Sequence, residues 1–167
     1  MVAGPDADPL SALIWLFLLE AELSDGEAAR AFGAAGLASL LSLGLVARLP
    51  GGRLAARVAL YPCCGAVIAT DRRTTIGTGR AARRNDRVMY LGPDSYLLAR
   101  LAPEPPAGGT VLDLCTGSGV HAILAAGRGA RVYGTDINPR AVVFARFNAH
   151  LNDVADRCVF RIGDLYH

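Results

Sequence analysis

Short apolar segments alternate with helical segments through the last third of the chain, and this alternation constrains the fold more than any other feature of the sequence. Each apolar segment has the length of a buried strand. The predicted strands are Thr110–Leu114, Arg131–Thr135 and Cys158–Ile162, and the predicted helices are Val120–Ala126 and Pro139–Leu151. Elements in this βαβαβ order predict half of a doubly wound α/β sheet, with parallel strands and both helices on one face.

A turn that contains two glycines follows the first predicted strand, at the end where ligands bind in sheets of this kind. It reads Asp113-Leu114-Cys115-Thr116-Gly117-Ser118-Gly119. Its glycines allow the backbone to approach a ligand closely, and the next helix directs free N–H groups to the same point. Proteins that bind nicotinamide, flavin or adenosylmethionine share such turns, so the turn predicts a cofactor site without naming the cofactor.

Two details of the turn distinguish between these cofactors. The dinucleotide pattern G-x-G-x-x-G would need further glycines where this chain has Cys115, Val120 or Ala122. Asp113 places a carboxylate in the turn, which would repel a pyrophosphate and attract an ammonium group. Both details favour adenosylmethionine, which carries an ammonium at its methionine end. A nicotinamide-dependent dehydrogenase is the less favoured alternative.

Aspartates also follow the second and third predicted strands. Asp136 ends the second strand, where its carboxylate can accept hydrogen bonds from both hydroxyls of a ribose. Asp164 follows the third strand, within reach of the exocyclic amine of an adenine that packs on Ile137. One aspartate at such a place could equally cap a helix or a turn. Three of them in this order, beside the glycine turn, indicate a cofactor site.

These motifs resemble those of class I S-adenosylmethionine-dependent methyltransferases. The similar segments are 111–120, 134–141 and 163–166, with residues 90–95 similar to the segment before the fold. The resemblance is closest to the methyltransferase small-domain group, which includes release-factor glutamine methyltransferases and ribosomal RNA guanine methyltransferases. It implies a Rossmann-like methyltransferase domain that binds S-adenosyl-L-methionine and methylates a nitrogen of a protein or nucleic-acid acceptor.

The resemblance also implies roles within the candidate site. Asp113 and the glycine turn would hold the methionine end of the cofactor, Asp136 the ribose and Asp164 the adenine. The full candidate set is Asp113, Cys115, Thr116, Gly117, Ser118, Gly119, Asp136, Ile137, Asn138, Asp164 and Leu165. No metal site is expected from the sequence.

The Asn-Pro-Pro-aromatic motif of the group, which holds the nitrogen that is methylated, does not occur in these 167 residues. We therefore expect the cofactor-binding half of a methyltransferase, truncated before that motif and inactive by itself, with catalytic residues and the methyl acceptor (protein, RNA or small molecule) unknown. His121 and His150 are the remaining catalytic candidates, but neither has a partner at a suitable spacing. A non-catalytic cofactor-binding or interaction module is the alternative.

Three helices followed by a hairpin are predicted before residue 71, which is the outline of a winged-helix domain. The predicted helices are Leu10–Leu23, Ser24–Phe32 and Ala34–Leu43, and the predicted strands are Val46–Leu49, Arg53–Tyr61 and Ala66–Thr70. Ser24 and Glu27 form a capping-box pattern, and Gly33 can end the second helix. The third helix has only Ser39 and Ser42 as polar side chains, so it lacks residues that read bases in a major groove. A packing or docking domain is favoured.

The basic charge is concentrated between the two predicted domains. The net charge is only +2, but residues 30 to 100 hold eleven arginines against three aspartates. Six of these arginines form a strip within the predicted linker 71–92: Arg72, Arg73, Arg80, Arg83, Arg84 and Arg87. The strip could contact nucleic-acid phosphates or be a solvated linker. The predicted domains are therefore a winged-helix-like accessory domain, residues 1–70, and a partial methyltransferase domain, residues 93–167.

Location and assembly follow from apolar patterning. The longest dense apolar run, Leu10–Leu19, has about half of the ~20 residues needed to cross a bilayer, so we expect no membrane segment and a cytoplasmic protein. The four cysteines show no metal or disulfide pattern and are expected to be reduced. The strand Thr110–Leu114 would lack one of the neighbours that the first strand has in this class, so self-association through an open sheet edge is expected.

Overall fold

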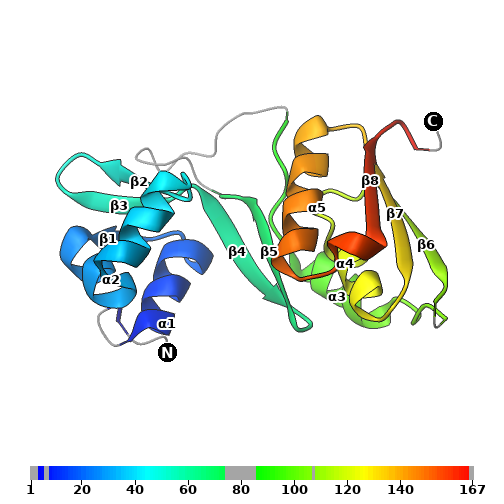
Figure 1. Ribbon diagram of the computed structural model, residues 1–167, viewed down its shortest axis with the longest axis horizontal. Helices are drawn as coiled ribbons and strands as arrows, with labels where there is room; N and C mark the ends of the chain where they lie inside the picture. The colour runs from blue at the N-terminus through cyan, green and yellow to red at the C-terminus, as the bar shows by residue number, and fades with distance from the viewer. Residues whose placement is uncertain (1–3, 6–7, 74–85, 107, 166–167) are drawn as a thin grey trace. The chain divides into compact units, whose positions relative to one another are not determined.

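The structure of the chain is a computed structural model that describes residues 4–5, 8–73, 86–106 and 108–165. Contacts divide the chain into two compact units (Figure 1). The first unit comprises Met1–Leu60 and Asp71–Arg83, and the second comprises Tyr61–Thr70 and Arg84–His167. The second unit therefore takes in residues 61–70, which precede the linker and which the sequence grouped with the N-terminal domain.

The first helix of the first unit is shorter than the sequence predicts. Helix α1 (Pro9–Leu13) continues into the π-helical turn η1 (Ile14–Leu18) and ends there. Glu20 then adopts a left-handed conformation with a φ of 57°, and strand β1 (Glu22–Ser24) pairs with a later strand. The prediction of one helix over Leu10–Leu23 is wrong at its C-terminal end, because an apolar run alone does not distinguish a buried helix from a buried strand.

The second and third predicted helices are confirmed as the two halves of α2 (Asp25–Ser42), which bends at Gly33 with a φ of 67°. Its capping box is also confirmed. The Ser24 hydroxyl accepts the Glu27 N–H at 3.2 Å, and the Glu27 carboxylate accepts the Ser24 N–H at 2.6 Å. Together these bonds satisfy two of the free N–H groups at the helix start.

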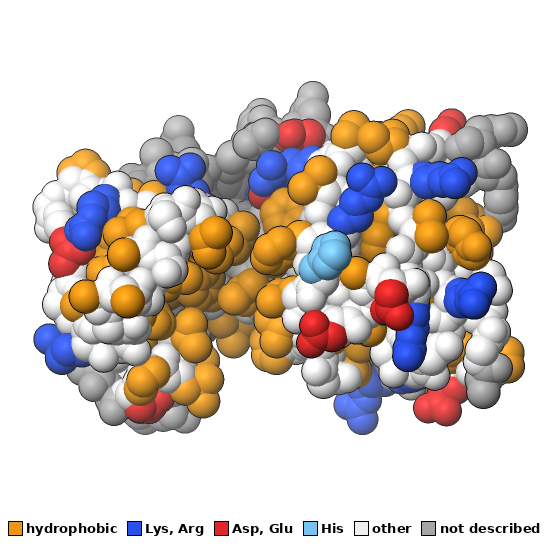
Figure 2. All heavy atoms as spheres, in the orientation of Figure 1, with side chains coloured by type: hydrophobic (Ala, Val, Ile, Leu, Met, Phe, Trp, Pro, Cys, Tyr) orange, Lys and Arg blue, Asp and Glu red, His pale blue; other side chains and the backbone are white. Residues whose placement is uncertain are grey.

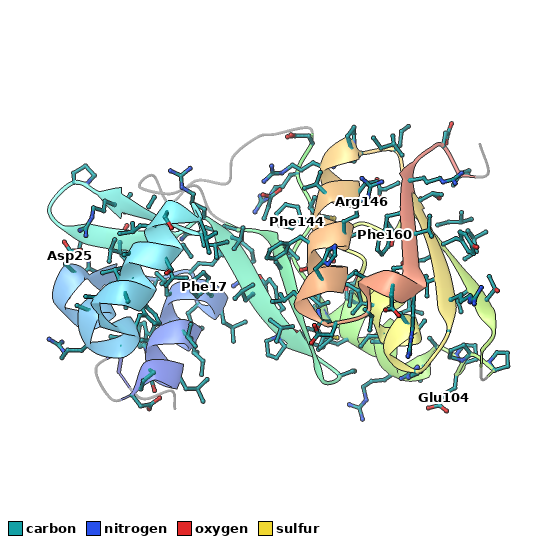
Figure 3. All side chains as sticks on the ribbon, in the orientation of Figure 1. Phe17, Asp25, Glu104, Phe144, Arg146 and Phe160 are labelled. Atoms are coloured by element: carbon teal, nitrogen blue, oxygen red, sulfur yellow. The ribbon has the colours of Figure 1, made fainter. Side chains whose placement is uncertain are left out.

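The sheet of the first unit is antiparallel, with the strand order β1-β3-β2. The hairpin of β2 (Val46–Leu49) and β3 (Arg53–Ala56) is confirmed, but the long predicted strand that starts at Arg53 breaks after Ala56, and β4 (Val58–Cys63) follows as a separate strand. The core lies between this sheet and the helices and includes Phe17, which Figure 3 labels. The fully buried large side chains of this core are Leu16, Leu23 and Leu54.

Arg72 is part of the core packing of the first unit, so the structure contradicts its prediction as a residue of an exposed basic strip. Its side chain is only 8% exposed. The guanidinium donates to the carbonyls of Ala56 at 2.7 Å and Glu20 at 2.6 Å, and it lies 3.5 Å from the Glu20 carboxylate. A guanidinium so engaged is not available to a phosphate.

Only two of the other arginines in the predicted strip lie among the described residues. Arg80, Arg83 and Arg84 lie outside the described residues. Arg87 is half-buried, and the backbone N–H of Arg73 donates to the Glu20 carboxylate at 2.7 Å. Figure 2 shows arginine side chains scattered among apolar and acidic ones on the visible face.

The second unit contains the predicted parallel sheet. Strands β6 (Thr110–Leu114), β7 (Arg131–Asp136) and β8 (Cys158–Ile162) pair in parallel in the order β6-β7-β8. Helices α4 (Val120–Gly127) and α5 (Pro139–Leu151) connect them. The βαβαβ prediction is confirmed in every element.

The two faces of this sheet differ in burial. Val132 and Phe160 lie on the face that packs against the helices and are buried, whereas Leu112, Tyr133 and Val159 lie on the other face and are exposed. Arg146 on α5 donates to the Phe160 carbonyl at 2.7 Å, which ties the helix to β8 (Figure 3). Helices normally cover both faces of a parallel sheet. Here the face that carries Leu112, Tyr133 and Val159 is apolar but exposed.

Two further elements complete the second unit. The hairpin of β4 and β5 (Ala66–Asp71) has most of its residues there, and the strand predicted at Ala66–Thr70 is thereby confirmed. Helix α3 (Pro93–Leu101) starts with Pro93 in its first turn. Its residue Tyr96 donates to the Pro62 carbonyl of β4 at 3.1 Å, so α3 and the hairpin are in contact.

Arg72→Ala should lower the free energy of unfolding of the first unit by about 3–5 kcal/mol, because the Glu20 carboxylate would stay buried without its cation. Trp15 is the only tryptophan and lies in this unit, so its fluorescence in a urea titration follows the first unit. Arg57→Ala, which removes an exposed arginine, is the control and should change the free energy by less than about 0.5 kcal/mol. Equal midpoints for both variants would contradict the structural role of Arg72.

Candidate functional site

The candidate site lies at the carboxyl ends of the parallel strands, where the segment 115–119, called the glycine loop below, joins β6 to α4. Three of its residues have positive φ: Cys115 at 55°, Gly117 at 55° and Gly119 at 82°. A Cβ added to Gly119 would lie 3.0 Å from the Cβ of Ala145 on α5. Glycine is required at this position for both conformation and space.

Asp136 connects the end of β7 to the glycine loop. Its Oδ2 accepts the Gly117 N–H at 2.8 Å, and its Oδ1 accepts the Asn138 N–H at 2.9 Å. Because a carboxylate has about four acceptor positions, each oxygen can still accept a further hydrogen bond from a ligand. The carboxylate is half-buried, so such a bond would form partly out of water.

Asp113 faces the start of α4 from the end of β6. Its Oδ2 accepts the Thr116 hydroxyl at 2.7 Å and the Ala122 N–H at 3.2 Å. Both of these bonds hold the turn in shape, and both use the same oxygen. The other oxygen of Asp113 is available for a cation.

Gly134 in β7 is a site residue that the sequence analysis missed. A Cβ at this position would lie 2.5 Å from the Phe160 ring and 3.1 Å from the Thr116 hydroxyl. Only glycine therefore lets the glycine loop and β8 pack against the middle of β7. A glycine inside a strand is itself a signal of such a close approach.

Asp164 lies beyond β8, and its side chain is exposed. The following residue approaches β7, since the Leu165 carbonyl accepts the Thr135 hydroxyl at 3.2 Å. Ile137 is 71% exposed and Leu165 is 48% exposed. Two apolar side chains thus face solvent beside the strand ends.

Asn138 has a structural role at the start of α5. Its side-chain oxygen accepts the Arg140 N–H at 2.9 Å, and its amide nitrogen donates to the Asp86 carbonyl at 2.8 Å. Its amide therefore caps the helix, as the sequence predicts, and holds the segment before α3. The structure leaves its side chain committed to these two partners.

A groove of about 480 Å³ runs along β6 between α3 and α4 and reaches Asp113. Its lining is mostly apolar and includes three prolines of the segment 103–106, while Glu104 and Arg128 add charged side chains. His121 borders the groove, and its Nδ1 is buried with no hydrogen-bond partner among the described residues. The structure thus brings His121 near Asp113, although the sequence showed no partner for this histidine.

Asn148 of α5, which contacts the glycine loop, and Asn152 just after the helix, which does not, were also missed as tertiary contacts. Asn148 is fully buried and donates to the Ser118 carbonyl in the glycine loop at 2.9 Å. Asn152 lies one turn later and donates to the Val67 carbonyl at 2.8 Å. Their signal in the sequence is the spacing, since asparagine is a poor helix former and two of them four residues apart share one helix face.

All four cysteines are free. Burial raises the pKa of the Cys63 and Cys158 thiols to about 11, with a contribution from neighbouring Cys64 at Cys63. Both thiols are therefore protonated at neutral pH, which makes them poor nucleophiles and poor metal ligands.

Within residues 4–5, 8–73, 86–106 and 108–165, no three His, Cys, Asp or Glu side chains come together as a metal site. None of the helices in these same ranges is both long enough and apolar enough to cross a membrane.

Two family models match separate parts of the chain. The model for ribosomal protein L11 methyltransferase (PrmA) matches residues 98–167. A domain of unknown function (DUF7059) matches residues 1–57. The boundary between the two matches agrees with the presence of two compact units.

Curated relatives are similar to part of the chain. A tRNA1(Val) (adenine(37)-N6)-methyltransferase of Porphyromonas gingivalis is 42% identical over 82 residues, which is 46% of this chain and 32% of the relative. A ribosomal protein L11 methyltransferase of Desulfitobacterium hafniense is 51% identical over 55 residues, 33% of this chain and 18% of the relative. The chain thus spans a third or less of these two relatives.

A solved structure supports the fold. The tRNA m1G37 methyltransferase of M. jannaschii superposes with a TM-score of 0.50 at 19% identity, covering 66% of this chain and 33% of that protein. This likeness supports a class I methyltransferase fold for the α/β part of the chain, of which that protein has more than the chain spans. Residues 98–167 are similar in sequence to the methyltransferase family model, and the chain is similar to these methyltransferases, so the resemblance seen in the sequence is confirmed.

Gly119→Ala should destabilise the second unit by more than about 1 kcal/mol, because alanine disfavours a φ of 82° and its Cβ would press on Ala145. Amide hydrogen exchange of β7, which lies in this unit alone, measures the free energy of opening. Gly127→Ala is the control, since no atom lies within 4 Å of the added Cβ. A control variant that loses as much stability would show that the packing behind Gly119 is unimportant.

Proposed function

We propose that the chain binds S-adenosylmethionine at the glycine loop and serves a methyltransferase. The observation that carries the proposal is the hydrogen bond from Gly117 to Asp136, which joins the loop to the neighbouring strand end. It places the Asp136 carboxylate, which can accept further hydrogen bonds, next to the backbone of Gly117, where no side chain blocks a ligand. A ribose above the Asp136 carboxylate would donate both hydroxyls to it.

The residues at the strand ends fit the other parts of this cofactor. In this proposal, the unused oxygen of Asp113 binds the ammonium of the methionine end, beside the glycine loop. Ile137 and Leu165 supply apolar surface for the two faces of the adenine, and Asp164 accepts from its exocyclic amine. Ile137 and Leu165 are 71% and 48% exposed, so both side chains are accessible to such a ligand.

The electrostatics of the site favour this ligand over a dinucleotide. Asp113 lies next to the glycine loop and would repel a pyrophosphate placed on the loop. Asp136 can accept ribose hydroxyls from either ligand, so it does not distinguish between them. Adenosylmethionine has no phosphate, and its ammonium and sulfonium are positively charged, so the acid that disfavours one ligand attracts the other.

The bound cofactor supplies an electrophilic methyl group, and the protein's task is to hold donor and acceptor in line. Within this chain, the glycine loop and the three aspartates orient the donor. The relatives are named as enzymes that act on tRNA adenine or on ribosomal protein L11. We infer that the acceptor of this protein is likewise an RNA or a protein.

We further propose that the first unit is a winged-helix-like accessory domain and that residues 93–167 form the methyltransferase domain, with residues 61–70 belonging to the second unit rather than to the accessory domain. The succession of helix, strand, two helices and hairpin, with the strand order β1-β3-β2, supports the winged-helix assignment. The arginines of its hairpin are engaged, since Arg48 pairs with Asp25 and Arg53 lies 3.6 Å from Glu22. This favours a docking role over the reading of bases.

The chain should bind S-adenosylhomocysteine with a lower Kd than NAD, because the Asp113 carboxylate at the glycine loop repels a pyrophosphate. Isothermal titration calorimetry with each ligand measures both constants. Tighter binding of NAD would contradict the proposed function.

Asp136→Ala should weaken the binding of S-adenosylhomocysteine about 10- to 100-fold, because two ribose hydroxyls lose a charged acceptor. The calorimetric Kd of the folded protein is the readout, and amide exchange of β7 reports stability separately. Asp156→Ala, which removes an exposed acid of the same unit, should leave the Kd unchanged. If Asp136→Ala unfolds the protein but the folded fraction binds as before, the residue is structural only.

We also propose self-association of the 167-residue chain through β6, which pairs only with β7 among the described residues and adjoins the exposed apolar sheet face. Light scattering should give a mass above that of the monomer. Leu112→Lys should shift the mass toward the monomer, because a charge beside a sheet edge disfavours strand pairing. Val143→Lys on α5 is the control for added charge. A monomeric parent chain would contradict the proposal.

A further inference from the structure

One side chain of α5 holds two separate segments of the second unit. Asn148 is 0% exposed. Its Oδ1 accepts the Ala69 N–H at 2.8 Å, and its Nδ2 donates to the Ala69 carbonyl at 2.8 Å and to the Ser118 carbonyl at 2.9 Å. A single carboxamide on α5 therefore forms hydrogen bonds to both strand β5 and the glycine loop.

The bonds of Asn148 define one orientation of its amide. A carboxamide has two N–H donors, and both are used, one for each carbonyl. A rotation by 180° would turn the amide oxygen toward both carbonyls and the NH₂ group toward the Ala69 N–H. Because no water reaches the group, such a rotation would leave several buried polar atoms without partners.

The glycine loop rests on α5 at a second point close to the first. Gly119 packs against Ala145, which lies three residues before Asn148 on the same helix face. On the loop's other side, the Gly117 N–H reaches the Asp136 carboxylate. The glycine loop therefore contacts α5 through Ser118 and Gly119, and it contacts the end of β7 through Gly117.

We propose that Asn148 is a positioning residue for the cofactor site. By fixing the Ser118 carbonyl it sets the loop conformation in which the Gly117 N–H meets Asp136, and it links that conformation to the β4–β5 hairpin. The effect on ligand affinity rests on the proposed function, because the ligand of the loop is the proposed cofactor. The effect on the conformation of the loop does not depend on it.

Asn152 provides a matched control. Its Oδ1 accepts the Val67 N–H at 2.8 Å, and its Nδ2 donates to the Val67 carbonyl at 2.8 Å. It therefore grips the same strand, two residues away, in the same manner. Its remaining bond goes to the Asn148 carbonyl in the helix and not to the glycine loop.

The experiment compares Asn148→Ala with Asn152→Ala in the 167-residue chain by two readouts. Calorimetry gives the Kd for S-adenosylhomocysteine, and amide exchange gives the protection of the Gly117 N–H without ligand. Asn148→Ala should weaken binding about tenfold or more and speed Gly117 exchange by a similar factor. Asn152→Ala should change each quantity by less than about threefold, although both variants loosen the hairpin.

Two further arms keep the test decisive. Asn148→Ser keeps a polar group in place of the carboxamide, so it replaces Asn148→Ala if that variant does not fold. Asn152→Ser is then the control. Asn148→Ser should again change the Kd and the Gly117 exchange rate more than the control does. Equal effects of the two positions on Gly117 exchange would overturn the positioning role. If the parent chain does not bind S-adenosylhomocysteine, the proposed function fails, and Gly117 exchange still decides the role of Asn148.

Discussion

The parallel pairing of β6 with β7 is the constraint on which the candidate site depends. It brings the carboxyl ends of both strands to one edge of the sheet, with Asp113 opposite Gly134. The Asp136 carboxylate accepts the Gly117 N–H, so Asp113 and Asp136 both lie beside the backbone of the glycine loop. Any slip in register would separate them, because each residue of slip moves side chains to the opposite face.

Two glycines and one asparagine determine how the glycine loop packs on the rest of the unit. Gly134 leaves room for the Phe160 ring and the Thr116 hydroxyl beside β7, and Gly119 leaves room for the Ala145 side chain. Asn148 then fixes the one carbonyl between Gly117 and Gly119. Gly117 and Gly119 carry no side chains, while the side chains of Thr116 and Ser118 are buried in the protein. Such a division suits a site that must present backbone N–H groups in a fixed array.

Predictions from the sequence were correct where the residues that form an element are close neighbours in the chain. The capping box at Ser24 and Glu27, the bend at Gly33 and the start of α5 at Asn138 were all predicted, since each involves residues at most four apart. The first helix was predicted too long because residues 22–24 form a strand only by pairing with residues 53–55. Arg72 was assigned to a basic strip because its partner Glu20 lies far away in the sequence.

The sequence by itself determined the order of strands and helices in the second unit, the position of the glycine loop and the three aspartates at the strand ends. These follow from periodicity and turn chemistry, which act between close neighbours. Only the tertiary structure decided that Asn148 holds both β5 and the glycine loop, that Gly134 lies under Phe160 and that Arg72 is buried. Each of these is a contact between residues far apart in the chain, and only packing decides which distant groups meet.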